Sequence, residues 1–169
     1  MKKLLPLFFA GSLVILDLAT KALTFMMETA VIIPNFLTFI YFENTGAGFG
    51  IFAGMANSAL WLGVFNLAVV IVLIAVYLGK KDWQKSSFFC VAFAFILAGA
   101  FGNMVDRFLL EFVRDFIHIH WFDFIFNLAD LWVTVGTILM VIFILFLSDR
   151  ALDKRAERKD RRERVNEAG

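Results

Sequence analysis

The sequence contains very little cysteine and, over one long stretch, no basic residue. Cys90 is the only cysteine among 169 residues, which rules out an intramolecular disulfide and a cysteine-based metal cluster. The formal net charge of +1 gives no electrostatic indication of a nucleic-acid partner. The stretch from Met27 to Ser58 contains no Lys or Arg. These absences argue against a disulfide-stapled domain and against a DNA- or RNA-binding protein.

Apolar residues dominate the composition of the chain. Hydrophobic residues make up 61% of the chain, and 22 of them are Phe, a composition too apolar for a soluble domain of this length. Stretches close to the ~20 residues needed to cross a ~30 Å hydrocarbon core occupy about residues 4–26, 59–78, 87–105 and 124–147. We therefore expect an all-α membrane protein, with one four-helix transmembrane domain over residues 1–149 and a charged cytoplasmic tail over residues 150–169.

The basic residues predict the orientation of this bundle. Lys2 and Lys3, the lysines between Lys80 and Lys85, and the tail from Arg150 to Arg164 all belong to one set of helix ends. Cytoplasmic loops carry an excess of Lys and Arg, so both termini should be cytoplasmic. The first apolar run continues to Met26, longer than the core of a secretory signal, so we expect it to be a retained helix.

Unusual polar residues converge on the opposite, outer ends of the helices. At ~1.5 Å per residue, Asp17 and Lys21 lie ~20–26 Å along the first span, in its outer half. Asn103 comes at the outer end of the third span, and Asn127 and Asp130 come at the outer start of the fourth. Structural polar residues have no reason to gather at one depth on several helices, so the pattern indicates a site near the outer face.

Two aspartates point to the chemistry of that site. Asp115 and Asp130 are ionisable groups at membrane depth, which are functional by default. Two carboxyl groups that share a site do not both ionise easily, so one keeps a proton and the pair can act as base and acid. Asn127 lies three residues before Asp130, on the same helical face, where it can orient an aspartate or bind substrate backbone.

Other polar residues have simpler interpretations. Asp17 and Lys21 are four residues apart and predict a buried ion pair that orients the first helix. Asp106 is a candidate partner that ties down the end of the third helix. The spacing of His118 and His120 suggests an extended or irregular segment, and we expect no metal there, because zinc usually needs three protein ligands in fixed geometry.

The outer connections should be short. Residues 30–42 are rich in β-branched and aromatic residues and predict a small extracytoplasmic β-rich segment. The glycines that follow, from Gly46 to Gly50, allow tight turns and close approach to a ligand. The connection over residues 106–123 predicts a short periplasmic loop or helix.

Together these motifs resemble the lipoprotein signal peptidases (signal peptidase II), small four-span bacterial inner-membrane aspartic peptidases. Five ordered blocks carry the resemblance: Asp17 with Thr20-Lys21, Asn44-Thr45-Gly46-Ala47 with Phe49, Gly99 with Gly102-Asn103 and Asp106-Arg107, Val113 with Asp115-Phe116, and Phe126-Asn127 with Ala129-Asp130. The chain departs from the family pattern at Ala98, Leu131, Gly48 and Gly50. None of these departures removes either aspartate.

The resemblance implies a catalytic dyad of Asp115 and Asp130 that cleaves a prolipoprotein just before its lipid-modified cysteine. It implies substrate binding by Asn44, Gly46, Asn103, Arg107 and Asn127, and structural support by Asp17 and Lys21, besides the support already suggested for Asp106. It implies no cofactor. The expected partners are lipid-modified prolipoproteins and membrane lipids, and the expected location is the bacterial cytoplasmic (inner) membrane.

Two alternatives come from other functional classes. A small proton-coupled carrier would use Asp17, Lys21 and the two aspartates as a relay, but carriers place such groups near the bilayer midplane and often show two repeated halves. A noncatalytic lipid-binding scaffold would keep the helix anchors without needing paired carboxyl groups.

Overall fold

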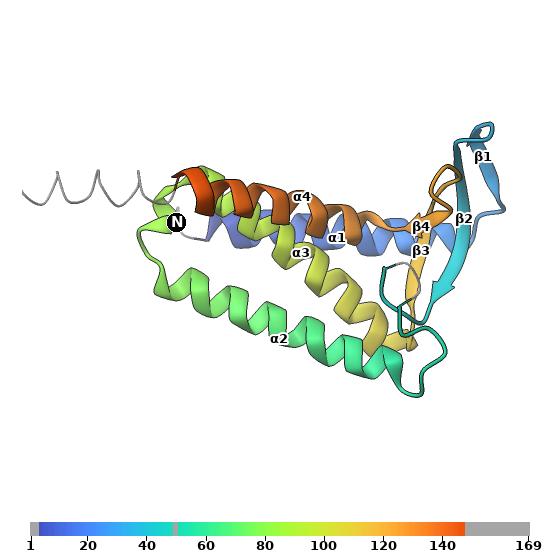
Figure 1. Ribbon diagram of the computed structural model, residues 1–169, viewed down its shortest axis with the longest axis horizontal. Helices are drawn as coiled ribbons and strands as arrows, with labels where there is room; N and C mark the ends of the chain where they lie inside the picture. The colour runs from blue at the N-terminus through green and yellow to red at the C-terminus, as the bar shows by residue number, and fades with distance from the viewer. Residues whose placement is uncertain (1–3, 49–50, 148–169) are drawn as a thin grey trace, which may run out of the picture.

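The computed structural model describes residues 4–48 and 51–147 and shows a bundle of long helices with a small sheet across one end (Figure 1). The helices long and apolar enough to cross a membrane are α1 (Leu5–Thr24), α2 (Ser58–Gly79), α3 (Ser87–Leu110) and a fourth span from Leu128 to Phe146. This last span consists of α4 (Leu128–Ile142) and the π-helical turn η3 (Phe143–Leu147). The predicted fold class is confirmed.

Two predicted helix boundaries differ from the observed ones. α3 continues to Leu110 and ends at Glu111, which adopts a left-handed backbone with φ of 66°. The fourth helix begins at Leu128 rather than near residue 124, because the apolar residues before it form strand β4 (Phe124–Phe126). Hydropathy does not distinguish three apolar strand residues from a helix start.

The sheet joins the two outer connections. Its strand order is β1 (Ala30–Ile33), β2 (Leu37–Asn44), β3 (Val113–Ile119) and β4, all antiparallel. The predicted β-rich segment therefore supplies β1 and β2, whereas the second connection supplies β3 and β4 instead of a simple loop. Pairing of β2 with β3 sets Phe42 opposite Asp115.

Helix α3 lies at the centre of the bundle and packs against α1, α2 and α4. Its contact with α4 is close because Gly99 has no side chain: a Cβ there would meet the carbonyl oxygen of Ala129 and, at 2.6 Å, a methyl of Val133. A Cβ at Gly136 of α4 would likewise lie 2.7 Å from the backbone nitrogen of Ile96. Small residues permit this approach of membrane helices.

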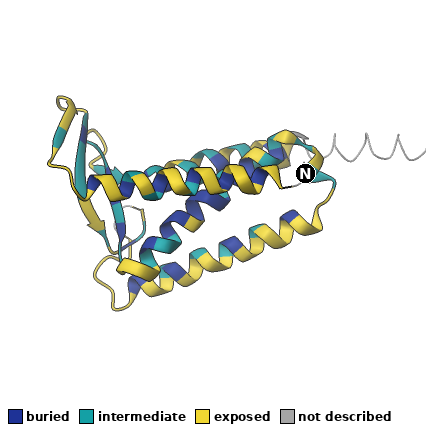
Figure 2. Cartoon of the chain, turned by 180° about the vertical axis from the view of Figure 1, so that it is seen from behind, coloured by how far each residue is buried: buried dark blue, intermediate teal, exposed yellow. Residues whose placement is uncertain are grey.

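At the end of the bundle opposite the sheet, the short 3₁₀ helix η2 (Trp83–Lys85) connects α2 to α3. Tyr77 and Phe93 stack there with ring centroids 4.4 Å apart, and Trp83 packs edge-on against Phe89 and Phe143. Large apolar residues are exposed along all four spans, and Figure 2 shows the exposed residues on the outward sides of the helices. This distribution suits a lipid surrounding rather than water.

Candidate active site

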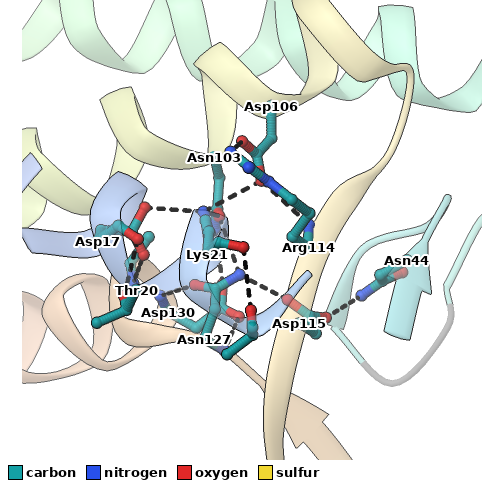
Figure 3. Close-up of polar contacts among 12 residues, drawn as sticks. Asp17, Thr20, Lys21, Asn44, Asn103, Asp106, Arg114, Asp115, Asn127 and Asp130 are labelled. Carbon is teal, nitrogen blue, oxygen red and sulfur yellow. Dashed lines mark hydrogen bonds and ion pairs between the residues drawn. The ribbon is translucent and has the colours of Figure 1, made fainter. Parts of the chain in front are cut away.

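Asp115 is a buried carboxyl group on strand β3, with 1% of its surface exposed. Two amide side chains donate hydrogen bonds to it: Asn44 Nδ2 to Oδ2 at 2.8 Å and Asn127 Nδ2 to Oδ1 at 2.5 Å. Asn44 comes from the end of β2 and Asn127 from the start of α4. The residues that hold Asp115 therefore come from both outer connections (Figure 3).

Burial, and to a smaller extent the nearby negative charge of Asp130, together raise the pKa of Asp115 to about 7. The hydrogen bonds from Asn44 and Asn127 oppose this shift because they stabilise the ionised form. The net effect is that Asp115 keeps a proton over a pH range in which an ordinary aspartate has lost it.

Asp130 lies in the first turn of α4, where it forms a capping box with Asn127. Asn127 Oδ1 accepts a hydrogen bond from the Asp130 backbone nitrogen at 3.0 Å, and Asp130 Oδ2 accepts one from the Asn127 backbone nitrogen at 3.3 Å. Such a box satisfies backbone donors that a helix start leaves free. Asn103 Nδ2 donates to the other oxygen, Oδ1, at 2.7 Å. Helix capping thus fixes the orientation of this carboxyl group.

Asn127 connects the two aspartates. Its backbone and side-chain oxygen hold Asp130, and its Nδ2 donates both to Asp115 and to Asn103 Oδ1, the latter at 3.2 Å. Asn127 is fully buried. The two carboxyl groups are therefore parts of one hydrogen-bonded unit.

Lys21 sets the orientation of the Asn103 amide. This lysine is fully buried, pairs with Asp17 at 2.8 Å and lies 3.5 Å from Asp106. It also donates to Asn103 Oδ1 at 2.9 Å. Because that oxygen accepts from Lys21 and Asn127, the amide nitrogen of Asn103 faces Asp130. The ion pair between Asp17 and Lys21 that the sequence predicts is present. Through Asn103 it connects directly to the hydrogen bonds that hold Asp130.

Asp106 joins the end of α3 to the start of β3. It accepts hydrogen bonds from the Arg114 backbone nitrogen at 3.0 Å and from the guanidinium group at 2.7 Å. Arg114 immediately precedes Asp115, so this clamp fixes the strand residue beside the candidate catalytic group. Arg114 was not among the sequence-predicted site residues, because nothing in its spacing shows that it contacts Asp106.

Gly46 and Arg107 meet at the turn after β2. Arg107 donates from Nη2 to the Gly46 carbonyl oxygen at 3.1 Å, and the Gly46 backbone nitrogen donates to Asn44 Oδ1 at 2.9 Å. A Cβ at Gly46 would lie 2.7 Å from the Ile51 carbonyl oxygen. The turn therefore needs a glycine, and it holds Asn44 against Asp115.

Beside these residues lies a cavity of about 600 Å³ between α2, α3 and α4. Asn103, Arg107 and Asp130 contribute to its wall, together with Ala47 and Gly48 of the turn. Most of the remaining wall is apolar: Leu62, Phe65, Val69, Ile96, Gly99, Ala100, Phe124, Phe126, Leu131 and Val133, with Asn66 and Thr134 as polar exceptions. Asp130 thus faces space that an apolar ligand can fill.

The two histidines lie outside this arrangement. His120 Nε2 is 2.7 Å from Thr38 Oγ1, and His118 Nε2 is 3.3 Å from Asp123 Oδ1. The two histidines lie in strand β3 and in the turn after it, in agreement with the extended or irregular segment predicted from their spacing. In residues 4–48 and 51–147, no group of three or more His, Cys, Asp or Glu side chains is placed to hold a metal ion.

The structure thus brings most of the sequence-predicted site residues into one polar unit: Asp17, Lys21, Asn44, Asn103, Asp106, Asp115, Asn127 and Asp130 (Figure 3). Gly46 and Arg107 lie at its edge. The sequence-based list omitted Arg114 and Asn66.

Residues 9–146 match a family model described as signal peptidase (SPase) II. A lipoprotein signal peptidase of Clostridium tetani is 34% identical over 140 residues, which cover 78% of this chain and 86% of that protein. One from Enterococcus faecalis is 34% identical over 152 residues, covering 86% of this chain and 91% of that protein. One from Clostridium novyi is 41% identical over 118 residues, covering 68% and 76%.

Two solved structures described as bacterial membrane enzymes, determined by the in meso method, are also similar. The one at 2.3 Å resolution has a TM-score of 0.73 at 34% identity and covers 83% of this chain and 87% of its own. The one at 1.9 Å has a TM-score of 0.71 at 32% identity and covers 85% and 94%.

Proposed function

The chain belongs to the signal peptidase II family, aspartic peptidases that remove signal peptides from prolipoproteins, and we propose that Asp115 and Asp130 are its catalytic pair. The observation that carries the proposal is their joint attachment to Asn127. One asparagine holds both carboxyl groups, one through its side chain and the other through a helix cap. That attachment keeps the pair in one relative orientation.

The two carboxyl groups take different roles because their surroundings differ. Asp115, whose pKa is raised to about 7, is the protonated partner and donates a hydrogen bond to the carbonyl oxygen of the scissile peptide. Asp130 faces the cavity and accepts hydrogen bonds from Asn103 and the Asn127 backbone, an arrangement suited to an ionised carboxylate. It takes a proton from the attacking water.

The reaction then follows general acid–base hydrolysis. A bond forms between the water oxygen and the carbonyl carbon while Asp130 removes the water proton and Asp115 stabilises the developing oxyanion. The carbon–nitrogen bond breaks, and the proton held by Asp130 passes to the leaving nitrogen. Asn103 and Asn127 keep Asp130 oriented through both steps.

The cavity supports cleavage before a lipid-modified cysteine. Its wall is mainly apolar and comes from helices long enough to span a membrane, and Asp130 lies at one side of it. A diacylglyceryl group on the cysteine keeps the substrate at bilayer depth and supplies acyl chains of matching polarity. The bond before that cysteine is then presented to the carboxyl pair.

The positions of the charges support an active site near the outer face. The lysines from Lys80 to Lys85 lie at the end of the bundle opposite the sheet, and Asp115 belongs to the sheet (Figure 1). With the basic end cytoplasmic, the sheet and the pair of aspartates face outward. The basic tail over residues 150–169 falls outside the described residues. A carrier is not favoured, because the carboxyl pair lies at one end of the bundle.

The test is cleavage of a diacylglyceryl-modified prolipoprotein peptide by the purified protein in detergent. We expect Asp115→Asn and Asp130→Asn each to lower kcat by roughly 10²- to 10⁴-fold. Asp123→Asn is the matched control, since that side chain is 95% exposed on the same outer connection. A chelator should change nothing. Folded mutants that still turn over at the wild-type rate would overturn the assignment of the pair.

A further inference from the structure

Asn66 is a polar residue in the middle of an apolar helix. It lies eight residues into α2, about 12 Å from the helix start at ~1.5 Å per residue, and it lines the cavity that Asp130 also lines. Leu62 and Val69, four residues before it and three after it, line the same cavity and are apolar. One amide therefore interrupts an apolar strip of cavity wall.

The Asn66 side chain has no hydrogen-bond partner within residues 4–48 and 51–147. Thr134, another polar residue of the cavity wall, differs in this respect, because its hydroxyl donates to the Asp130 carbonyl oxygen at 2.8 Å. An unpaired amide in a membrane span is costly and points to a partner that arrives with a ligand. A leucine at this position would be more favourable in lipid.

A substrate bound in the cavity offers suitable partners. A signal peptide must leave the helical conformation around the bond that is cut, which frees backbone carbonyl groups in a region where no water can satisfy them. The lipid-modified cysteine brings ester carbonyl groups to the same place. Both sources offer the same chemistry, a carbonyl oxygen that accepts a hydrogen bond from an amide N–H.

We propose that Asn66 is a substrate-positioning residue that donates from Nδ2 to a carbonyl oxygen of the substrate inside the cavity. This inference rests on the proposed function. The amide adds one directional contact to a wall whose apolar residues bind chains without a preferred register. Asn66 thereby strengthens binding in the register that places the scissile bond beside Asp130, while the carboxyl pair cuts it.

The test compares Asn66→Leu, Asn66→Gln and wild type on a diacylglyceryl-modified peptide. The control is Val64→Leu, on the same helix but outside the cavity wall. Loss of one uncharged hydrogen bond predicts a KM for Asn66→Leu raised roughly 3- to 10-fold with kcat nearly unchanged. Asn66→Gln should recover most of the affinity, and Val64→Leu should match wild type. An unchanged KM in a well-folded Asn66→Leu, checked by gel filtration, overturns the proposal.

A second substrate identifies the source of the carbonyl. Ether-linked alkyl chains lack ester carbonyl groups. If the KM ratio between Asn66→Leu and wild type persists on this substrate, the partner is the peptide backbone, and if it falls to one, the partner is the lipid ester. A ratio of one on both substrates overturns the proposal.

A binding measurement separates this proposal from the proposed function. Fluorescent lipopeptide is titrated into Asp130→Asn and into Asp130→Asn/Asn66→Leu, neither of which needs to turn over. Weaker binding by the double mutant supports the Asn66 contact even if wild type proves inert, and equal binding overturns the contact even if wild type cleaves.

Discussion

Asn127 Nδ2 lies 2.5 Å from Asp115 Oδ1, so the residue that caps α4 also holds a carboxyl group on a neighbouring strand. A helix cap normally affects only stability. Here the amide nitrogen of Asn127 donates to a proposed catalytic carboxyl group, and its amide oxygen caps the helix. The two contributions of Asn127 can therefore be separated by substitution.

Asn127→Ser keeps a side-chain oxygen that caps the helix but removes the donor to Asp115. We expect this variant to unfold near the wild-type temperature while kcat falls by at least 10²-fold, as expected for loss of oriented acid–base catalysis. Asn127→Ala should lose the same activity and, in addition, about 1 kcal/mol of stability. The measurements are turnover of the lipidated peptide and thermal unfolding in detergent. Full activity in Asn127→Ser would show that the donor contact is dispensable.

Lys21 is the cation between two buried carboxyl groups, so its removal should be costly. Lys21→Met leaves Asp17 without its partner and should destabilise the protein by about 3–5 kcal/mol. The double variant Asp17→Asn/Lys21→Met removes both charges and should be considerably more stable than the single one. Thermal unfolding of both single variants and the double variant gives the coupling. Strict additivity would mean that the pair contributes no interaction energy.

The raised pKa of Asp115 predicts a pH dependence with a definite sign. The ordinary pKa of an aspartate is 3.8 and the pKa of Asp115 in the folded chain is about 7, so the folded chain binds this proton more tightly. The resulting stability is complete below pH 3.8 and is lost as the pH rises through 7. It amounts to at most about 4 kcal/mol. Because the proposed mechanism needs protonated Asp115, the rate of cleavage should also fall as the pH rises through about 7.

Asp115→Asn provides the control, because it carries no titrating proton at this position. Unfolding temperatures measured from pH 5 to pH 8 should fall more steeply for wild type than for Asp115→Asn, so that the variant is relatively most stable at high pH. Parallel curves would show that Asp115 titrates with its ordinary pKa, and its role as the protonated partner would then be wrong.

The close contact at Gly99 makes the position of Asp130 sensitive to a single methyl group. Gly99→Ala places a Cβ against the Ala129 carbonyl oxygen, so α4 must shift and take the next residue, Asp130, with it. We expect a loss of about 1–3 kcal/mol of stability and a clear fall in kcat. Gly11→Ala is the matched control, since nothing lies within 4 Å of a Cβ there. Similar effects of the two substitutions would rule out the packing explanation.

The sequence was sufficient to predict the four spans and to single out the two aspartates that the structure joins through Asn127, because each has a local signal. Length and hydropathy identify helices such as α2, and an aspartate such as Asp130 is conspicuous in an apolar run. Asn66 also had such a signal, as a lone amide in an apolar span, but only the cavity shows what it faces.

Other features depend on distant parts of the chain. The spacing of His118 and His120 indicated an extended segment, but the pairing of Phe39 with Ile117 joins residues far apart in sequence, so the place of β3 in the sheet could not be predicted from its own pattern. The contact of Arg114 with Asp106 requires the turn between α3 and β3. The predicted start of α4 was too early because Phe124–Phe126 are as apolar as the helix that follows them. Asn127 and Asp130 form the capping pattern that marks the true start of the helix.

The antiparallel sheet has a consequence for biogenesis. Strand β2 emerges with the first helical hairpin, but its partner β3 is synthesised some seventy residues later, and Asn127 later still. A nascent chain with two inserted helices therefore carries Asn44 without Asp115, the carboxyl group that it contacts. A chain with three inserted helices carries strand β3 with Asp115 but still lacks Asn127, which orients that carboxyl group. With Asp115 and Asp130 as the proposed catalytic pair, we expect proteolytic activity only after the last span has entered the membrane, and an incompletely translated chain to be inert toward other membrane proteins.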